Sequence, residues 1–255
     1  DWDYLTKLAP EDGSVNLQKI TTQMGVLVLA GPRARDVLQK LTDSDLSNDS
    51  FKWLTGKSIN VGYAQAEALR VNFVGELGWE LHHPIEMQNY IFDELMKAGA
   101  EFDIKPFGIR AMDSMRLEKS YRLIPREMSI EYAALESGLD RFVKLDKECD
   151  FVGKQALQAW QERGFENAFA TLEVHGIKDA DARGSEGLYK DGILVGRATS
   201  GGYGFRTEKS LALGIVKAGY AAIGTELEIE ILGERYRATV IEESPFDANN
   251  SALRA

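Results

Sequence analysis

The sequence is poor in the residues that build disulfides and metal sites. Its 255 residues include one cysteine, Cys149, and three histidines. A single cysteine excludes an internal disulfide and any zinc or iron–sulfur site that needs several thiolates. Two of the histidines, His82 and His83, are adjacent, so on a strand their side chains point to opposite faces and cannot hold one metal ion together. We therefore expect no metal site.

Long apolar runs and concentrated positive charge are also lacking. No apolar stretch approaches the ~20 residues of a membrane-spanning helix. The 30 Lys and Arg stand against 40 Asp and Glu, which gives a net charge of −10. This excess of acid argues against nucleic acid and against an anionic membrane as partners. The first residues show no secretory signal, so we expect a cytoplasmic protein, or one of the mitochondrial matrix if the source is eukaryotic.

The remaining composition is that of a folded protein with room for two domains. Hydrophobic residues make up 44% and charged residues 27% of the chain, as in ordinary globular proteins. The patterning predicts an α+β fold, in which a mixed α/β domain with an antiparallel sheet and helices precedes a small C-terminal antiparallel β-barrel. We place the first domain at residues 1–150, a linking helix at 151–166 and the barrel at 167–255.

The pattern of expected secondary structure changes between these parts. In the first part strand-like and helix-like segments alternate, whereas after Phe169 short strands follow one another with tight turns at Asp191-Gly192 and Gly233-Glu234. The expected strands lie at residues 15–20, 25–29, 58–63, 68–74, 79–82, 170–174, 187–189, 193–199, 210–216, 225–231 and 235–241. The expected helices lie at residues 33–41, 86–97, 109–120 and 151–163.

The segment from Val71 to Pro84 is the most informative one. It has the pattern of two strands around a turn from Gly75 to Gly78, with Glu80 just inside the second strand and the aromatic residues Phe73 and Trp79 nearby. Aromatic faces and a carboxylate suit a flat, nitrogen-rich heterocycle, which stacks on the rings and donates N–H groups to the acid. A glycine-bounded hairpin with one glutamate is usually only a hairpin, so the segment alone leaves a purely structural role open.

Four segments in the same order resemble the folate-binding aminomethyltransferase superfamily, the glycine-cleavage T-protein family. They span residues 26–38, 71–80, 111–119 and 199–214. The first resembles the family's strand, Gly-Pro and helix, the second its glycine-bearing hairpin, the third its Arg-Asp-Ser-Leu-Arg-Leu-Glu helix and the last part of its barrel. Details of residues 74–81, 116–122 and 200–214 are most similar to the C-terminal half of dimethylglycine and sarcosine dehydrogenases.

The resemblance implies a function and its cofactors. In those dehydrogenases an FAD domain oxidises an N-methylamine, and the folate domain captures the one-carbon unit as methylene-tetrahydrofolate. The expected cofactor of this chain is therefore tetrahydrofolate. The expected partners are a one-carbon unit derived from a methylated amine and an FAD domain or subunit, with FAD bound there and not by this chain.

The resemblance also implies site residues. Glu80 falls on the carboxylate that holds the amino and ring N–H groups of the pteridine. Phe73 falls on an aromatic position, usually Tyr, close to the folate, and Tyr121 falls on another aromatic position of the pocket. Met112 stands where the glycine-cleavage enzyme has an Arg that contacts folate, which argues against that specific activity. Arg206 and Arg254 are candidates for the glutamate tail of the folate.

The chain resembles the family only from partway into its fold. The family's catalytic Asp lies upstream of anything that matches Asp1, so no catalytic residue is assigned and this chain alone is expected to be a poor enzyme.

Two alternative functions stay open at this point. A free-standing folate-dependent aminomethyltransferase or demethylase is one alternative reading. A non-catalytic folate-binding module is the other.

Overall fold

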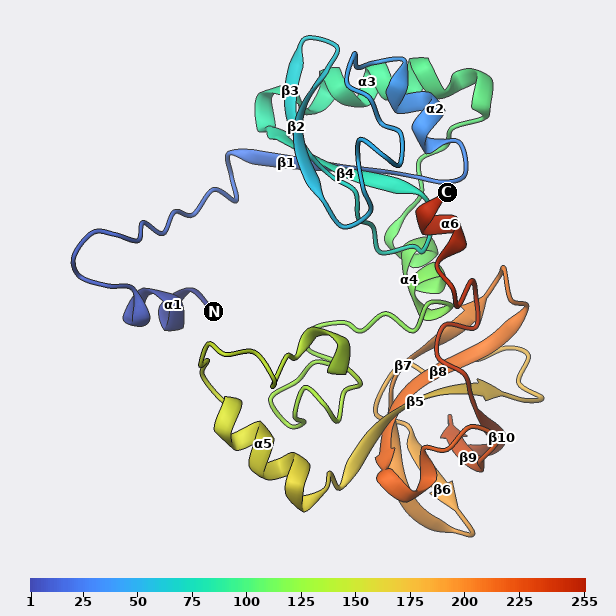
Figure 1. Cartoon of the computed structure of the whole chain (residues 1–255). Coiled ribbons are helices and arrows are strands. Elements are labelled where there is room, and N and C mark those ends of the chain that lie inside the picture. The colour runs from blue at the N-terminus through green and yellow to red at the C-terminus, as the bar shows by residue number, and fades with distance from the viewer. The chain divides into compact units, whose positions relative to one another are not determined.

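The computed structural model describes all residues, 1–255, and they form two compact units. One unit, here called the sheet unit, comprises Asp1–Asn72, Glu76–Lys105 and Leu253–Ala255. The other, the barrel unit, comprises Phe73–Gly75 and Pro106–Ala252. Figure 1 shows the elements of each unit. The predicted domain boundaries at residues 150 and 167 were placed where the pattern of strands and helices changes along the sequence, whereas the two units are defined by contacts in space. The predicted boundaries stay a prediction.

The sheet unit contains a four-stranded antiparallel sheet with the order β1-β4-β3-β2. Its strands are β1 (Met24–Ala30), β2 (Gly56–Val61), β3 (Ala64–Leu69) and β4 (Gly78–Pro84). Its helices are α1 (Trp2–Leu8), α2 (Ala34–Gln39), α3 (Gln88–Gly99) and the short 3-10 turns η1 (Ile85–Met87) and η2 (Ala100–Phe102). Helices α2 and α3 pack on one face of the sheet, where the hydrophobic core of the unit lies.

Alternation along the strands decides which face of this sheet is buried. In β3 the side chains of Ala64, Ala66 and Ala68 are buried, whereas the intervening Gln65 and Glu67 are exposed. Successive side chains of a strand point to opposite faces, so the alanines face the helices and the polar residues face away. The opposite face of the sheet is therefore free to carry polar chemistry.

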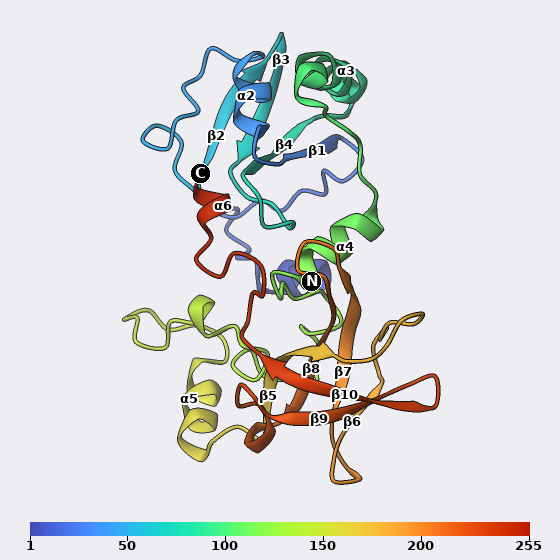
Figure 2. The ribbon, with the colours of Figure 1, turned by 90° about the vertical axis from the view of Figure 1, so that its right-hand side faces the viewer.

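The barrel unit contains a closed antiparallel barrel with the strand order β10-β5-β8-β7-β6-β9. Figures 1 and 2 show these strands from two directions. The strands are β5 (Asn167–Val174), β6 (Gly187–Lys190), β7 (Ile193–Gly204), β8 (Lys209–Lys217), β9 (Glu226–Ile231) and β10 (Glu234–Ile241). The helices are α4 (Ile109–Leu117), α5 (Lys154–Arg163), η3 (Asp140–Phe142) and η4 (Ala218–Tyr220), and the short α6 (Ser251–Arg254) follows the barrel.

The predicted fold class is confirmed: an antiparallel sheet with helices is followed by an antiparallel barrel. Each predicted barrel strand is present, because alternation and tight turns are local signals. The strand expected at residues 15–20 is wrong, since this segment has no regular structure. Val15 and Ile20 are each 47% exposed, so no buried face exists there to fix a strand. Helix α1, which has no buried residue, was not predicted.

The predicted hairpin at residues 71–84 needs a correction. Strand β3 ends at Leu69, which pairs with Glu80, and the residues between Leu69 and Gly78 form a loop rather than a strand and a tight turn. At the start of this loop the backbone of Arg70 bonds to the segment before β2: its amide donates to the carbonyl of Thr55 at 2.9 Å, and its carbonyl accepts from the amide of Leu54 at 3.2 Å. Asn72 Nδ2 donates to the carbonyl of Glu76 at 2.6 Å. These bonds stand in place of strand pairing between residues 70 and 77, and an Asn side chain bonded to its own loop backbone favours a loop over a strand.

Candidate functional site

The structure brings two of the four predicted site residues into contact. The rings of Phe73 and Tyr121 stack with 5.5 Å between their centroids and 27° between their planes, and both side chains are half-buried in the barrel unit. Met112 is half-buried on α4 of the same unit. Glu80 lies on β4 of the sheet unit.

The loop that carries Phe73 is held against the residues that follow α4. Gly75 has φ +76°, and a Cβ atom built on it would lie 2.5 Å from Cγ of Lys119, so the loop backbone lies directly on the lysine's aliphatic stem. Lys119 is 1% exposed, and its Nζ donates to the carbonyls of Phe246 and Asp247 and to Oδ1 of Asn250 at 3.2, 2.7 and 3.0 Å. Because the lysine is fixed at its charged end, its stem is a rigid support for residues 73–75.

The backbone of Tyr121 is fixed by Arg116. The amide of Tyr121 donates to the carbonyl of Arg116 at 3.0 Å, and Nη1 of Arg116 donates to the carbonyl of Tyr121 at 3.0 Å. Burial raises the pKa of the Tyr121 phenol, with Arg141 opposing this shift, Asp247 adding to it and Arg206 also opposing it. The phenol is therefore neutral at physiological pH and keeps its hydroxyl group for hydrogen bonding.

Glu80 lies on the face of the sheet that points away from α2 and α3. Its cross-strand neighbours are Val28 on β1 and Leu69 on β3. Its side chain is 29% exposed, and Oε2 lies 3.1 Å from Nε2 of His82. A part-exposed carboxylate flanked by apolar side chains can accept N–H groups of a ligand in partly water-excluded surroundings.

Trp79, which the sequence places next to the predicted carboxylate, does not share its face. The side chain of Trp79 is fully buried in the core of the sheet unit. Its ring contacts Phe51 edge-on, with 6.1 Å between the centroids. The expectation that Trp79 and Glu80 act together is therefore wrong, because neighbouring residues on a strand point to opposite faces.

A buried charged cluster around α4 was not found from the sequence. Arg116 is fully buried; its Nε donates to Asp113 at 2.6 Å, and its Nη1 lies 3.7 Å from Glu127. Glu127, also fully buried, accepts hydrogen bonds from the hydroxyls of Thr199 and Ser200 at 2.5 and 2.6 Å. Arg and Glu are usually surface residues, so no local signal in the sequence separates these two from solvated charges.

Of the two candidates for a folate tail, Arg206 is engaged within its own unit. Its Nε donates to the buried carboxylate of Glu118 at 2.5 Å, and its guanidinium lies 3.8 Å from the ring centroid of Phe246. Arg254 is exposed and lies over the ring of Trp53 at 4.8 Å. A role of either arginine in binding a glutamate tail stays a prediction.

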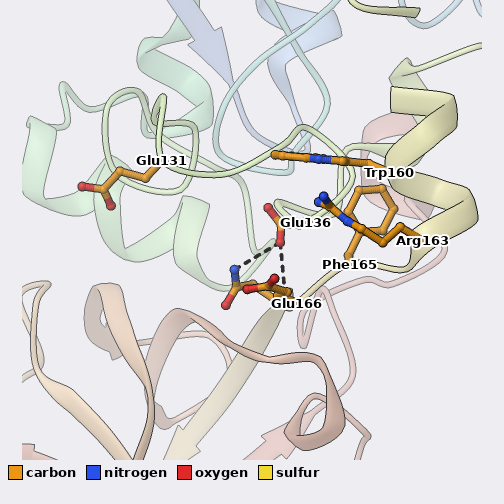
Figure 3. Close-up of a pocket in the computed structure, with 7 residues that line it drawn as sticks. Glu131, Glu136, Trp160, Arg163, Phe165 and Glu166 are labelled. Atoms are coloured by element: carbon orange, nitrogen blue, oxygen red, sulfur yellow. Dashed lines mark hydrogen bonds between the residues drawn. The ribbon is translucent and has the colours of Figure 1, made fainter. Parts of the chain in front are cut away.

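A small pocket in the barrel unit involves none of the predicted site residues. It has a volume of about 190 Å³, below the ~300 Å³ at which ligand pockets usually begin. In Figure 3 the ring of Trp160 lies over Arg163, and the carboxylate of Glu136 receives hydrogen bonds from Asn167. The lining residues are Glu131, Glu136, Trp160, Arg163, Phe165, Glu166 and Asn167. Of its lining carboxylates, Glu136 is bonded to Asn167 and Glu131 is paired with Arg197 outside the lining, so we do not assign the function to this small pocket.

Two kinds of feature are absent from the structure. No group of three or more His, Cys, Asp or Glu side chains is arranged to hold a metal ion. None of the helices combines the length and the apolar character that crossing a membrane requires.

Comparison with known families defines the class of protein. The model of the GCVT N-terminal domain matches residues 1–147, and that of the glycine cleavage T-protein C-terminal barrel domain matches residues 168–247. The chain therefore belongs to the glycine cleavage T-protein family. A crystal structure of glycine cleavage system aminomethyltransferase T from Bartonella henselae has the same fold, with a TM-score of 0.77 and 22% identity over 88% of this chain and 60% of that one.

Individual relatives include both oxidoreductases and transferases. Mitochondrial dimethylglycine dehydrogenase of Homo sapiens is 43% identical over 229 residues, which are 90% of this chain and 26% of the enzyme. Mitochondrial sarcosine dehydrogenase of Homo sapiens is 29% identical over 262 residues, 28% of its length. Aminomethyltransferase of Desulfitobacterium hafniense is 32% identical over 94% of this chain and 65% of that protein. The chain thus spans about a quarter of each dehydrogenase and just under two thirds of the transferase.

Proposed function

We propose that this chain is a tetrahydrofolate-binding one-carbon transfer domain of an FAD-linked N-methylamine dehydrogenase of the dimethylglycine and sarcosine type. In this role it captures the oxidised methyl group as methylene-tetrahydrofolate. The observation that carries the proposal is the supported stack of Phe73 on Tyr121, two positions at which the family resemblance implies folate contacts. The similarity to dimethylglycine dehydrogenase, at 43% identity, supports the dehydrogenase branch of the proposal.

The proposed residues supply recognition rather than bond-making. The carboxylate of Glu80 accepts the amino and ring N–H groups of the pteridine, an arrangement in which a planar acid matches two parallel donors. Phe73 and Tyr121 offer ring faces for stacking, and the neutral Tyr121 phenol adds a hydroxyl that Phe73 lacks. The bound folate supplies the nucleophilic nitrogen that takes up the one-carbon unit. The part of these residues is to hold that nitrogen in place and to exclude water around it.

Met112 is the reason to prefer the dehydrogenase role over glycine cleavage. A thioether has no positive charge and no N–H donor, so it cannot make the contact that the resemblance assigns to arginine at this position. We propose that FAD belongs to a partner domain or subunit, which delivers the oxidised one-carbon unit. The dehydrogenase relatives are described as mitochondrial, and for a eukaryotic source we propose the mitochondrial matrix, otherwise the cytoplasm.

A second candidate function is a free-standing folate-dependent aminomethyltransferase or demethylase. It is favoured by the transferase relative, of which this chain covers a much larger share than of the dehydrogenases. Transfer of a one-carbon unit to folate without any flavoprotein would support this candidate. Folate binding without turnover in either setting would support a non-catalytic binding module.

The test is a calorimetric titration of the chain with 5-formyltetrahydrofolate, a stable reduced folate. We expect micromolar binding that weakens at least tenfold, by about 1.4 kcal/mol or more, in Glu80→Ala. Glu86→Ala, an exposed acid of the same unit, serves as the matched control and should bind like the wild type. Absence of binding by the wild-type chain, or equal binding by Glu80→Ala, would overturn the proposal.

A further inference from the structure

We infer that His82 is a positioning residue for Glu80: its Nε2–H holds the carboxylate in the orientation that receives the ligand. This inference rests on the proposed folate site at Glu80. It concerns a residue to which neither the sequence patterns nor the family resemblance assigned a role in ligand binding. His82 does not contact the ligand in this proposal; it acts through Glu80.

The two side chains share one face of β4. Along this strand Leu81 and His83 are buried toward the core, whereas Glu80 and His82 alternate with them and point to the opposite face. Nε2 of His82 lies 3.1 Å from Oε2 of Glu80, and the side chains are 31% and 29% exposed. An ionised carboxylate only accepts hydrogen bonds, so the imidazole is the donor and Nε2 carries the proton.

The other residues on this face leave His82 as the single partner of Glu80. The neighbouring β1 places Val28 opposite Glu80 and Val26 opposite His82, and neither valine side chain can form a hydrogen bond. On β3, Leu69 lies opposite Glu80 and Glu67 opposite His82. His82 is therefore the only side chain of the structure that hydrogen-bonds to the Glu80 carboxylate.

Glu67 gives the imidazole a second acidic neighbour. Glu67 lies opposite His82 on β3, and cross-strand neighbours on one face have Cβ atoms about 5 Å apart. The hydroxyl of Ser58 donates to Glu67 and draws that acid toward β2. The imidazole of His82 therefore donates its N–H to Glu80 and not to Glu67. No basic side chain of β1, β3 or β4 occupies this face to compete for the carboxylate.

The consequence for recognition is preorganisation. A glutamate has several rotatable bonds, and a bond from a neighbour two residues away restricts the carboxylate before the ligand arrives. The bond occupies one position on Oε2 and leaves Oε1 and the second lone pair of Oε2 for N–H donors. Losing the imidazole would not remove the acceptor; it would make the acceptor less well placed, and affinity would fall.

His83 shows the contrast with a structural histidine. It is fully buried, with Nδ1 2.8 Å from the carbonyl of Leu81 and Nε2 2.8 Å from Oε1 of Gln88. Both ring nitrogens lie within hydrogen-bond distance of an oxygen atom of the sheet unit, so this ring has its polar contacts inside the core. The adjacent histidines therefore have separate tasks, and His83 provides an internal reference for the experiments below.

The first experiment is a titration of the full chain with 5-formyltetrahydrofolate in a double-mutant cycle. We expect His82→Ala to weaken binding about five- to tenfold, because the carboxylate remains as an acceptor but loses the bond that orients it. His82→Gln, whose amide N–H can still donate, should restore binding to within about twofold. In a Glu80→Ala background, His82→Ala should have no further effect.

The outcomes of this cycle separate the inference from the proposed function. If Glu80→Ala weakens binding but His82→Ala does not, the positioning role is overturned and the folate site stands. The positioning role is also overturned if His82→Ala causes the same loss with and without Glu80. If the wild-type chain binds no folate, the proposed function fails, and with it any role of His82 in folate binding.

The second experiment needs no ligand. Nitrogen-15 spectra of the imidazoles should show His82 protonated at Nε2, and Glu80→Gln should move the Nε2 signal of His82 while the signals of His83 and His175 stay in place. With three histidines in the chain, the assignment follows from single substitutions. An unchanged His82 signal in Glu80→Gln would show that the contact is absent in solution and would overturn the inference, whatever the folate titration gives.

Discussion

The rings of Phe73 and Tyr121 stack on each other, although one lies in the loop before β4 and the other follows α4. An aromatic pair of this kind contributes about 0.5–1.5 kcal/mol beyond the area it buries. We expect Phe73→Leu to lower the affinity for 5-formyltetrahydrofolate three- to tenfold, because both the pair and one ring face for the ligand are lost. Phe205→Leu, which alters a 77% exposed ring of the same unit, is the matched control. Equal affinity of Phe73→Leu and wild type would contradict the assigned role.

The support beneath this pair depends on Gly75. Its φ of +76° disfavours any side chain, and a Cβ atom would lie 2.5 Å from Cγ of Lys119, whose charged end cannot move away. We expect Gly75→Ala to lower the free energy of unfolding by about 1–3 kcal/mol in urea denaturation. Gly219→Ala, at an exposed glycine with no atom near its Cβ position, should change it by less than about 0.5 kcal/mol. Similar values for both variants would show that the loop does not rest on Lys119.

The buried phenol of Tyr121 makes stability depend on alkaline pH. Because burial raises its pKa above the ordinary value of about 10, the unfolded chain releases the proton first as the pH rises. The contribution of the buried phenol to the free energy of unfolding is fully present below pH 10, and it is lost as the pH rises from there through the folded-state pKa. We expect the free energy of unfolding to fall more steeply above about pH 10 in the wild type than in Tyr121→Phe. If the free energy of unfolding depended on pH in the same way in the wild type and in Tyr121→Phe, the phenol would be exposed to water and not buried.

Glu127 neutralises a buried arginine. Removing its carboxylate in Glu127→Ala leaves Arg116 with Asp113 as the remaining acid and deprives two hydroxyls of their acceptor. Breaking a buried pair in this way costs about 3–5 kcal/mol, and we expect a loss of that size in chemical denaturation. Lys105→Ala, which breaks an exposed pair with Asp103, should cost at most about 1 kcal/mol. A loss in Glu127→Ala as small as that of Lys105→Ala would contradict the burial of this cluster.

Leu253 anchors the last residues of the sequence to the sheet unit. Its side chain is 3% exposed, and Nη2 of Arg70 donates to the carbonyls of Leu253 and Ala255 at 3.5 and 3.2 Å. We expect Leu253→Ala to lower the free energy of unfolding of the sheet unit by about 2–5 kcal/mol. Leu232→Ala, at a side chain that is 89% exposed, is the control and should be nearly neutral. If the two variants melt alike, the segment does not pack as described.

The sequence alone determined the elements whose signals are local. The six barrel strands follow from alternation and from tight turns such as Asp191-Gly192, and α2 begins shortly after the Gly31-Pro32 pair, with Arg33 as its N-cap. The candidate site residues came from motifs in linear order, because a family's binding residues keep their place along the chain. Their identity could be proposed without coordinates; their surroundings could not.

The tertiary structure decided which side chains meet and which charges are buried. Alternation separates Trp79 from Glu80, but only the packing of α2 and α3 says that Trp79 is the buried one. Nothing local marks Lys119 or Glu127 as fully buried, because a charge can leave water only when partners from distant segments, here residues 246–250 and 199–200, compensate it. The stack of Phe73 on Tyr121 and the support from Lys119 exist only once those distant segments are folded together.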